Sequence, residues 1–151
     1  MSYGTDLYQE LILDHGRKPR NHHVLEGATA KALGHNPLCG DKTTIYVAVK
    51  DGVVKDVSFV GSGCAISQAS TSLMTEAVRG RTLAEIETIY GRFHDLVTGT
   101  PPSEEEEEAL GKLAAFAGVA EFPMRVKCAT LAWHTLRAAL QGSTTPATTE
   151  F

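Results

Sequence analysis

The stretch TTIYVAVKDGVVKDVSFV, residues 43–60, decides the fold of this chain. Its first eight residues alternate, which places four β-branched or aliphatic side chains on one face of a strand: Thr43, Ile45, Val47 and Val49. Asp51 and Gly52 then supply the two positive-φ positions of a tight hairpin turn. Residues 53–60 form the return strand, and residues 27–33, which alternate more weakly, are a further strand candidate. The sequence therefore predicts a small antiparallel sheet.

Helical periodicity covers most of the remaining chain. Apolar residues recur at spacings of three and four, as they do in amphipathic helices that pack on a core. Gly16 and Pro19 end the first of these helices, and Pro123 begins the last. The expected helices cover residues 5–15, 65–79, 83–93, 101–118 and 123–140.

Two of these helices carry a complete N-terminal signal. Thr82 with Glu85, and Ser103 with Glu106, match the capping box, in which two side chains satisfy backbone N–H groups reciprocally. The acidic run at residues 104–108 follows the second box directly. It lies in the first turns of that helix, where the helix dipole favours negative charge. We therefore expect this run to be a structural feature.

Length and composition are typical of one soluble globular domain. The chain has 151 residues, a formal net charge of −4 and 42% apolar residues. No basic field suited to nucleic acid is expected. No stretch reaches the ~18 apolar residues of a membrane span, and residues 1–6 lack the pattern of a signal peptide, so we expect no membrane association and a cytoplasmic protein. We expect one domain over residues 1–142 and a disordered tail over residues 143–151.

Three cysteines are the residues best suited to chemistry. Three is an odd number and cytosolic thiols stay reduced, which disfavours a disulfide framework and favours metal binding or thiol chemistry. Cys39 lies in a loop before a strand, Cys64 follows Gly-Ser-Gly at the start of a helix, and Cys128 lies early in the last helix. Each is near the end of an element, so all three can converge on one rim of the sheet.

Asp41 completes a possible ligand set. It lies two residues after Cys39, so both side chains point the same way in extended backbone. Three thiolates and one carboxylate give the four ligands of a tetrahedral zinc site, and thiolates select zinc or iron–sulfur chemistry. From spacing alone, His35 remains a substitute ligand, and each cysteine taken singly also fits an ordinary core or turn position.

Three motifs in order resemble the IscU/NifU N-terminal superfamily. They are Asn36-Pro37-Leu38-Cys39-Gly40-Asp41, Gly61-Ser62-Gly63-Cys64-Ala65-Ile66-Ser67 and Arg125-Val126-Lys127-Cys128-Ala129-Thr130-Leu131-Ala132-Trp133. The resemblance covers nearly the whole chain. It implies an α+β fold, with a small three-stranded antiparallel sheet packed against several helices.

Within that superfamily the chain looks like the SufU branch. Scaffolds of the IscU type have a histidine directly before the third cysteine, where this chain has Lys127. The chain also has a longer stretch between its second and third cysteines, which contains the helix expected over residues 101–118. Both departures match SufU.

The SufU resemblance implies a zinc-dependent sulfurtransferase enzyme that acts in iron–sulfur cluster biogenesis. It implies zinc held by Cys39, Asp41, Cys64 and Cys128, with Cys39 as the acceptor of persulfide sulfur. The donor is a SufS-type cysteine desulfurase that uses pyridoxal phosphate, and one of its histidines replaces Cys39 on zinc. Arg125 matches a family arginine that assists the released thiolate or the persulfide. The sulfur then passes to a SufB-containing assembly complex, and the acceptor role suggests a monomer.

Two other functions use the same residues. The first is an iron–sulfur cluster assembly scaffold, in which the cysteines hold a [2Fe–2S] cluster. The second is a purely structural zinc protein, in which the metal contributes folding energy and no desulfurase responds.

Overall fold

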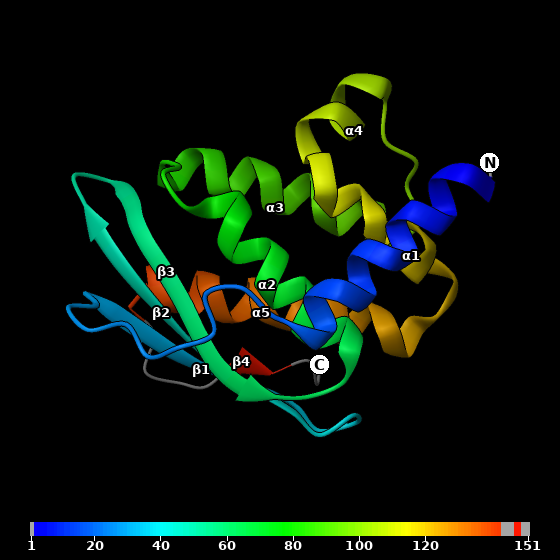
Figure 1. The fold of residues 1–151 in the computed structure, drawn as a ribbon. Helices are drawn as coiled ribbons and strands as arrows, with labels where there is room; N and C mark the ends of the chain where they lie inside the picture. Colours follow the sequence, from blue (N-terminus) through cyan, green and yellow to red (C-terminus); the bar gives the residue numbers. More distant parts are fainter. Residues whose placement is uncertain (1, 143–146, 149–151) are drawn as a thin grey trace.

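The computed structural model describes residues 2–142 and 147–148, with side chains from residue 8 to residue 142. A sheet lies on one side of the molecule and the helices gather on the other (Figure 1). The elements, in chain order, are α1 (Ser2–Arg17), β1 (Ala30–Asn36), β2 (Asp41–Lys50), β3 (Val53–Ser62), α2 (Ala65–Val78), α3 (Leu83–Val97), α4 (Glu104–Leu110), the 3₁₀ segment η1 (Gly111–Glu121), α5 (Pro123–Leu140) and β4 (Ala147–Thr148). The predicted α+β class is confirmed.

The sheet has the strand order β3-β2-β1-β4. β1, β2 and β3 pair antiparallel, which confirms the three-stranded sheet. The turn between β2 and β3 has φ of 54° at Asp51 and 75° at Gly52, as the hairpin pattern requires. The first strand begins three residues later than predicted and continues to Asn36, which brings it to the cysteine loop.

The two-residue strand β4 pairs parallel with β1 at Gly34 and His35. It belongs to the segment 143–151, for which the sequence predicts a disordered tail. The other residues of that segment lie outside the described part of the chain, so the prediction for them stays a prediction.

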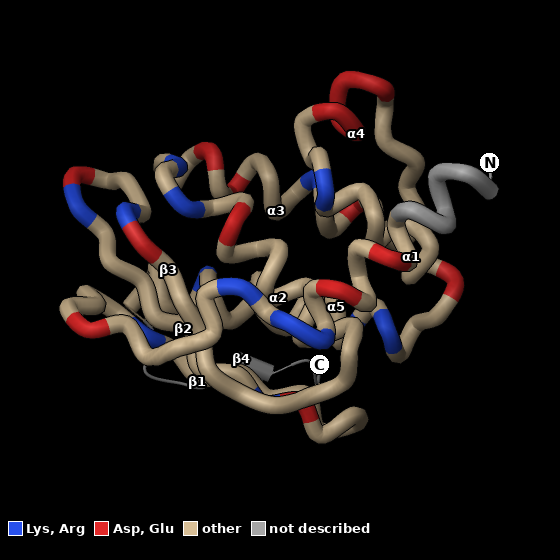
Figure 2. The backbone as a smooth tube through the Cα atoms, viewed as in Figure 1, with Lys and Arg blue, Asp and Glu red and all other residues tan. Residues whose placement is uncertain are grey.

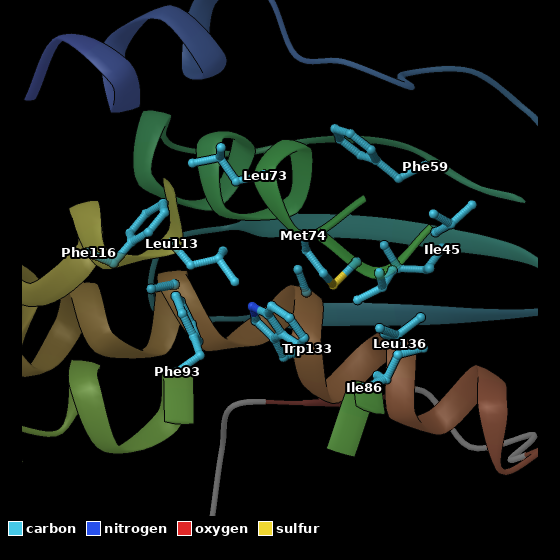
Figure 3. Packing of buried hydrophobic residues seen from close by; sticks show 14 of the residues in the cluster. Ile45, Phe59, Leu73, Met74, Ile86, Phe93, Leu113, Phe116, Trp133 and Leu136 are labelled. Atoms are coloured by element: carbon cyan, nitrogen blue, oxygen red, sulfur yellow. The ribbon is translucent and has the colours of Figure 1, made fainter. Parts of the chain in front are cut away.

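One face of β2 carries both the core and the first site residue. Asp41, Thr43, Ile45 and Val47 alternate with more exposed neighbours and are all buried. Ile45 and Val47 join a core that includes Met74 from α2 and Trp133 from α5 (Figure 3). Because a strand repeats every two residues, the pattern that buries Ile45 also turns Asp41 inward at the end of the strand.

The helices that cover this face hold the other site residues. α5 packs on β1 and β2, α2 packs on β3 and on α5, and α1 lies along α2. Gly16 permits the last contact, since a Cβ there would lie only 3.3 Å from the Cβ of Ala65, the first residue of α2. The N-terminus of α2 is thus fixed between α1 and the sheet.

Both capping boxes form as predicted, at Thr82 with Glu85 and at Ser103 with Glu106. The helix expected over residues 101–118 is partly wrong, because the α-helix ends at Leu110. Gly111 has a φ of 56°, which ends the α-helix, and the chain continues as 3₁₀ turns. Residues 113–116 are all buried in succession, a pattern that no amphipathic α-helix gives.

The acidic run occupies α4, at the edge of the molecule away from the sheet (Figure 2). Among the described residues, no helix has the length and the apolar content that crossing a membrane requires.

A buried histidine joins α1 to α2. His15 is 1% exposed, and its Nδ1 lies 2.7 Å from the Oγ of Ser72. The same Oγ also accepts the backbone N–H of Arg20. The Nε2 of His15 lies 3.7 Å from a carboxylate oxygen of Glu76. Burial lowers the pKa of His15, Arg20 lowers it further, and Glu76 opposes the shift.

We predict that the stability of the fold falls in mild acid because of His15. The unfolded chain takes the proton at the ordinary pKa of 6.5, whereas the folded protein resists it. The contribution of His15 to the free energy of unfolding should be fully present above that pH. The free energy of unfolding should decline as the pH falls through that value. Denaturant titrations at several pH values measure this decline, which should be smaller in His15→Gln. The exposed His23 supplies the control: His23→Gln should keep the wild-type decline, and an unchanged decline in His15→Gln would contradict the assignment.

Candidate metal centre

The four residues predicted to bind a metal come from three separate parts of the chain. Cys39 lies in the loop between β1 and β2, and Asp41 is the first residue of β2. Cys64 is the N-cap residue of α2, and Cys128 lies in the second turn of α5. The three elements meet at one end of the sheet, as the positions of the cysteines suggest.

The four side chains converge. The Sγ atoms of Cys39 and Cys128 are 3.3 Å apart. One carboxylate oxygen of Asp41 lies within 4.8 Å of both sulfurs. The Sγ of Cys64 lies 4.0 Å from the Oδ2 of Asp41. Cys39, Asp41 and Cys128 therefore form one group of possible ligand atoms, and the sulfur of Cys64 adjoins this group at Asp41.

Asp41 is the centre of this arrangement. It is fully buried, and its Oδ1 accepts the backbone N–H of Cys64 at 2.8 Å. That hydrogen bond leaves Oδ2 as the oxygen that faces the sulfurs. Gly63 makes the arrangement possible, because a Cβ at this residue would lie 2.5 Å from Oδ1.

Cys64 has a lowered pKa because its sulfur accepts hydrogen bonds from Cys128 and from the start of α2. Its sulfur caps α2 by accepting the backbone N–H of Ser67 at 3.4 Å. Hydrogen bonding from the Cys128 thiol and from the Ser67 backbone lowers the pKa of Cys64 to about 6, against the opposing effect of burial. A low-pKa sulfur is a good metal ligand, because metals bind the thiolate.

Cys128 and Cys39 differ most in their exposure. Cys128 is 2% exposed, and its hydrogen bond to Cys64 together with burial raises its pKa. Cys39 is exposed on the loop, where Gly40 adopts a φ of 72° to close the turn. The sulfur of Cys39 is therefore accessible from solvent, whereas the sulfur of Cys128 is buried.

The donor set fits zinc. Three sulfurs and one oxygen match the ligand number and type of tetrahedral zinc sites. Thiolates also suit iron–sulfur clusters and disfavour magnesium and calcium. The convergence of these side chains in the protein alone supports the predicted ligand set, and metal binding by it stays a prediction.

Two other residues considered from the sequence lie elsewhere. His35 precedes the buried Asn36 on β1, so its side chain leaves the opposite face of the strand. The guanidinium of Arg125 lies over the ring of Phe122, 4.6 Å from the ring centroid. Arg125 and Phe122 line a groove of about 570 Å³ between α1, η1 and the start of α5.

Asn36 is the site residue that the cysteine pattern does not reveal. It is fully buried and pairs with Asp41 across β1 and β2. Its Nδ2 lies 3.3 Å from the Oδ2 of Asp41 and 3.5 Å from the Sγ of Cys128. The sequence pattern gave no signal for it, because the pairing of Asn36 with Asp41 depends on strand register and on a strand that continues past residue 33.

We predict that Gly63→Ala weakens metal binding. The added methyl group would displace the Asp41 carboxylate from its contact with Cys64. Changes to the groups that orient metal ligands typically cost about 10- to 100-fold in affinity, and we expect a loss of zinc affinity in that range. A competition titration with a chromophoric chelator measures it.

Gly91 provides the matched control, because it lies within α3 and a Cβ there meets nothing within 4 Å. Gly91→Ala should keep the zinc affinity and should stabilise the helix by up to about 1 kcal/mol. Equal zinc affinity in both variants would contradict the role of Gly63.

Comparison with known proteins identifies the relatives of this chain. The family model of the NifU-like N terminal domain matches residues 7–141. The chain is 39% identical over 137 residues to the iron-sulfur cluster assembly scaffold protein IscU of Streptococcus pyogenes serotype M1, covering 91% of this chain and 84% of the relative. It is 37% identical over 139 residues to the zinc-dependent sulfurtransferase SufU of Bacillus subtilis (strain 168), covering 90% of this chain and 92% of the relative.

A solved structure shares the fold. The crystal structure of FiSufU from Fervidobacterium islandicum AW-1 matches with a TM-score of 0.80 and 37% identity, covering 87% of this chain and 94% of that chain. The match of the family model over nearly the whole chain and the shared fold lead to one conclusion. The chain belongs to the NifU-like N-terminal domain family, which includes the IscU and SufU proteins of iron–sulfur cluster assembly.

Proposed function

We propose that this protein is a zinc-dependent sulfurtransferase of iron–sulfur cluster assembly. It accepts persulfide sulfur from a SufS-type cysteine desulfurase and passes the sulfur to a SufB-containing assembly complex. Zinc is held by Cys39, Asp41, Cys64 and Cys128, and Cys39 is the acceptor.

The exposure of Cys39 is the observation that carries this proposal. A sulfur acceptor must reach the active site of another protein, and Cys39 lies exposed on a short loop. Asp41 and Cys128 are buried, and the backbone N–H of Cys64 holds Asp41 in place. The centre thus combines one accessible sulfur with ligands that stay fixed when that sulfur reacts.

The chemistry of transfer is a thiolate attack. The Cys39 thiolate attacks the terminal sulfur of the desulfurase persulfide, a new S–S bond forms on Cys39, and the desulfurase cysteine leaves as a thiolate. This exchange follows the rules of thiol–disulfide exchange. Bound zinc supplies deprotonated sulfurs at neutral pH without redox chemistry of its own.

Lys127 supports the sulfurtransferase over the scaffold. The scaffold branch has a histidine at this position, directly before the third cysteine, and histidine can bind a metal. A lysine ammonium group has no lone pair, so it adds no ligand to the three sulfurs and the carboxylate. The similar SufU of Bacillus subtilis is described as a zinc-dependent sulfurtransferase.

Arg125 is the second residue that we assign to the reaction. It lies in the first turn of α5, one turn before Cys128, and it is exposed. Its guanidinium contacts the Phe122 ring in the free protein. We assign it to the stabilisation of the Cys39 thiolate or of the approaching persulfide when the desulfurase is bound.

The cluster scaffold is the second candidate. Relatives named as iron-sulfur cluster assembly scaffold proteins reach 39% identity, slightly above the sulfurtransferase relative. The same three sulfurs and carboxylate suit a [2Fe–2S] cluster.

The deciding experiment compares the cysteine turnover of the desulfurase with zinc-loaded protein and with metal-stripped protein. We predict stimulation by the zinc form alone and loss of that stimulation in Cys39→Ala. The exposed Ser62, near Cys64 in sequence, provides the control, and Ser62→Ala should stimulate as the wild type does.

Normal sulfur acceptance by Cys39→Ala would contradict the assigned acceptor. If zinc is dispensable and iron with sulfide forms a cluster that passes to an apo-ferredoxin, the scaffold is the correct function.

A further inference from the structure

Asn36 occupies a special place beside the metal centre. It is the last residue of β1 and is fully buried. In the antiparallel register it pairs directly with Asp41, so the two side chains leave the same face of the sheet side by side. Its carboxamide therefore lies against the candidate ligands.

The carboxamide of Asn36 contacts three parts of the centre. Its Nδ2 donates to the Oδ2 of Asp41 at 3.3 Å and to the Sγ of Cys128 at 3.5 Å. Its Oδ1 accepts the backbone N–H of Leu38 at 3.3 Å. One side chain thus links two candidate ligands to each other and to the loop that carries the third, Cys39.

In these hydrogen bonds the carboxamide of Asn36 donates to Asp41 and Cys128, as a centre with bound metal requires. A metal requires Asp41 and Cys128 in their anionic forms, and hydrogen bonds to anions are stronger than those between neutral groups. An NH₂ group offers two donors, and two acceptors lie within its reach. Because the site is buried, an unpaired anion there would be costly.

We propose that Asn36 is a positioning residue of the metal centre. It fixes Asp41 and Cys128 relative to each other, and it anchors the base of the loop beneath Cys39. The fixed pair then stays in place when the exposed Cys39 reacts. This inference rests on the proposed zinc function and adds a residue that binds the ligands rather than the metal.

The test uses two variants of different shape. Asn36→Ala removes the hydrogen bonds and leaves a cavity, whereas Asn36→Leu removes the hydrogen bonds but keeps the number and branching of the side-chain heavy atoms. Both proteins are isolated with zinc bound, so that folding of the metal-free form is not required. We expect zinc affinity to fall about 10- to 100-fold in both, in the range typical of residues that orient metal ligands. Zinc should pass faster to a chromophoric chelator, and the visible spectrum of the cobalt-substituted protein should change.

Ser72→Ala is the matched control for lost hydrogen bonds. Ser72 is fully buried and joins His15 and Arg20 at the interface of α1 and α2. This variant should unfold at a lower temperature but keep the wild-type zinc affinity and cobalt spectrum.

Two results would overturn the inference. If Asn36→Leu restores the zinc affinity and cobalt spectrum that Asn36→Ala loses, Asn36 acts by packing alone. If both variants behave as the wild type does, Asn36 has no role in metal binding. A wild-type protein that binds no zinc refutes the proposed function itself and this inference with it.

Discussion

The hydrogen bond from the Cys64 backbone to the Asp41 carboxylate is the constraint on which the site depends. It ties the β1–β2 hairpin to the start of α2, two parts of the chain 23 residues apart. A buried carboxylate without partners would be unstable, so sheet and helix have to meet at this point. Gly63 provides the space for the contact, and Gly16 brings α1 onto the same end of α2. The packing of the helices and the geometry of the candidate ligands therefore share one cause.

The candidate site places two fixed, buried ligands within a few ångströms of one ligand that solvent can reach. Cys128 is fixed by a long buried helix and Asp41 by the edge of the core, while Cys39 lies on a short exposed loop. A structural zinc site would gain from burying all its ligands. Exposure of a single sulfur is better explained by a centre in which one ligand takes part in a reaction.

Much of this arrangement could be predicted from the sequence, because its signals are local. The alternation around Ile45 and the Asp51-Gly52 turn define the hairpin, and the capping boxes define where two helices begin. The cysteine positions at the ends of elements predict their convergence. Periodicity alone does not predict the end of α4, because it does not distinguish a glycine of positive φ such as Gly111 from an ordinary helical glycine. The role of Asn36 depends on strand register, which single-residue patterns do not specify.

The closeness of Cys39 to Cys128 has a consequence for oxidative stress. Peroxide reaches an exposed cysteine first, and the sulfenic acid that forms either condenses with a nearby thiol or is oxidised irreversibly. Cys128 lies 3.3 Å away and is shielded from solvent, so it can serve as the resolving thiol. The buried sulfur would then protect the accessible one, and the resulting disulfide would withdraw two candidate metal ligands until a reductant restores both thiols.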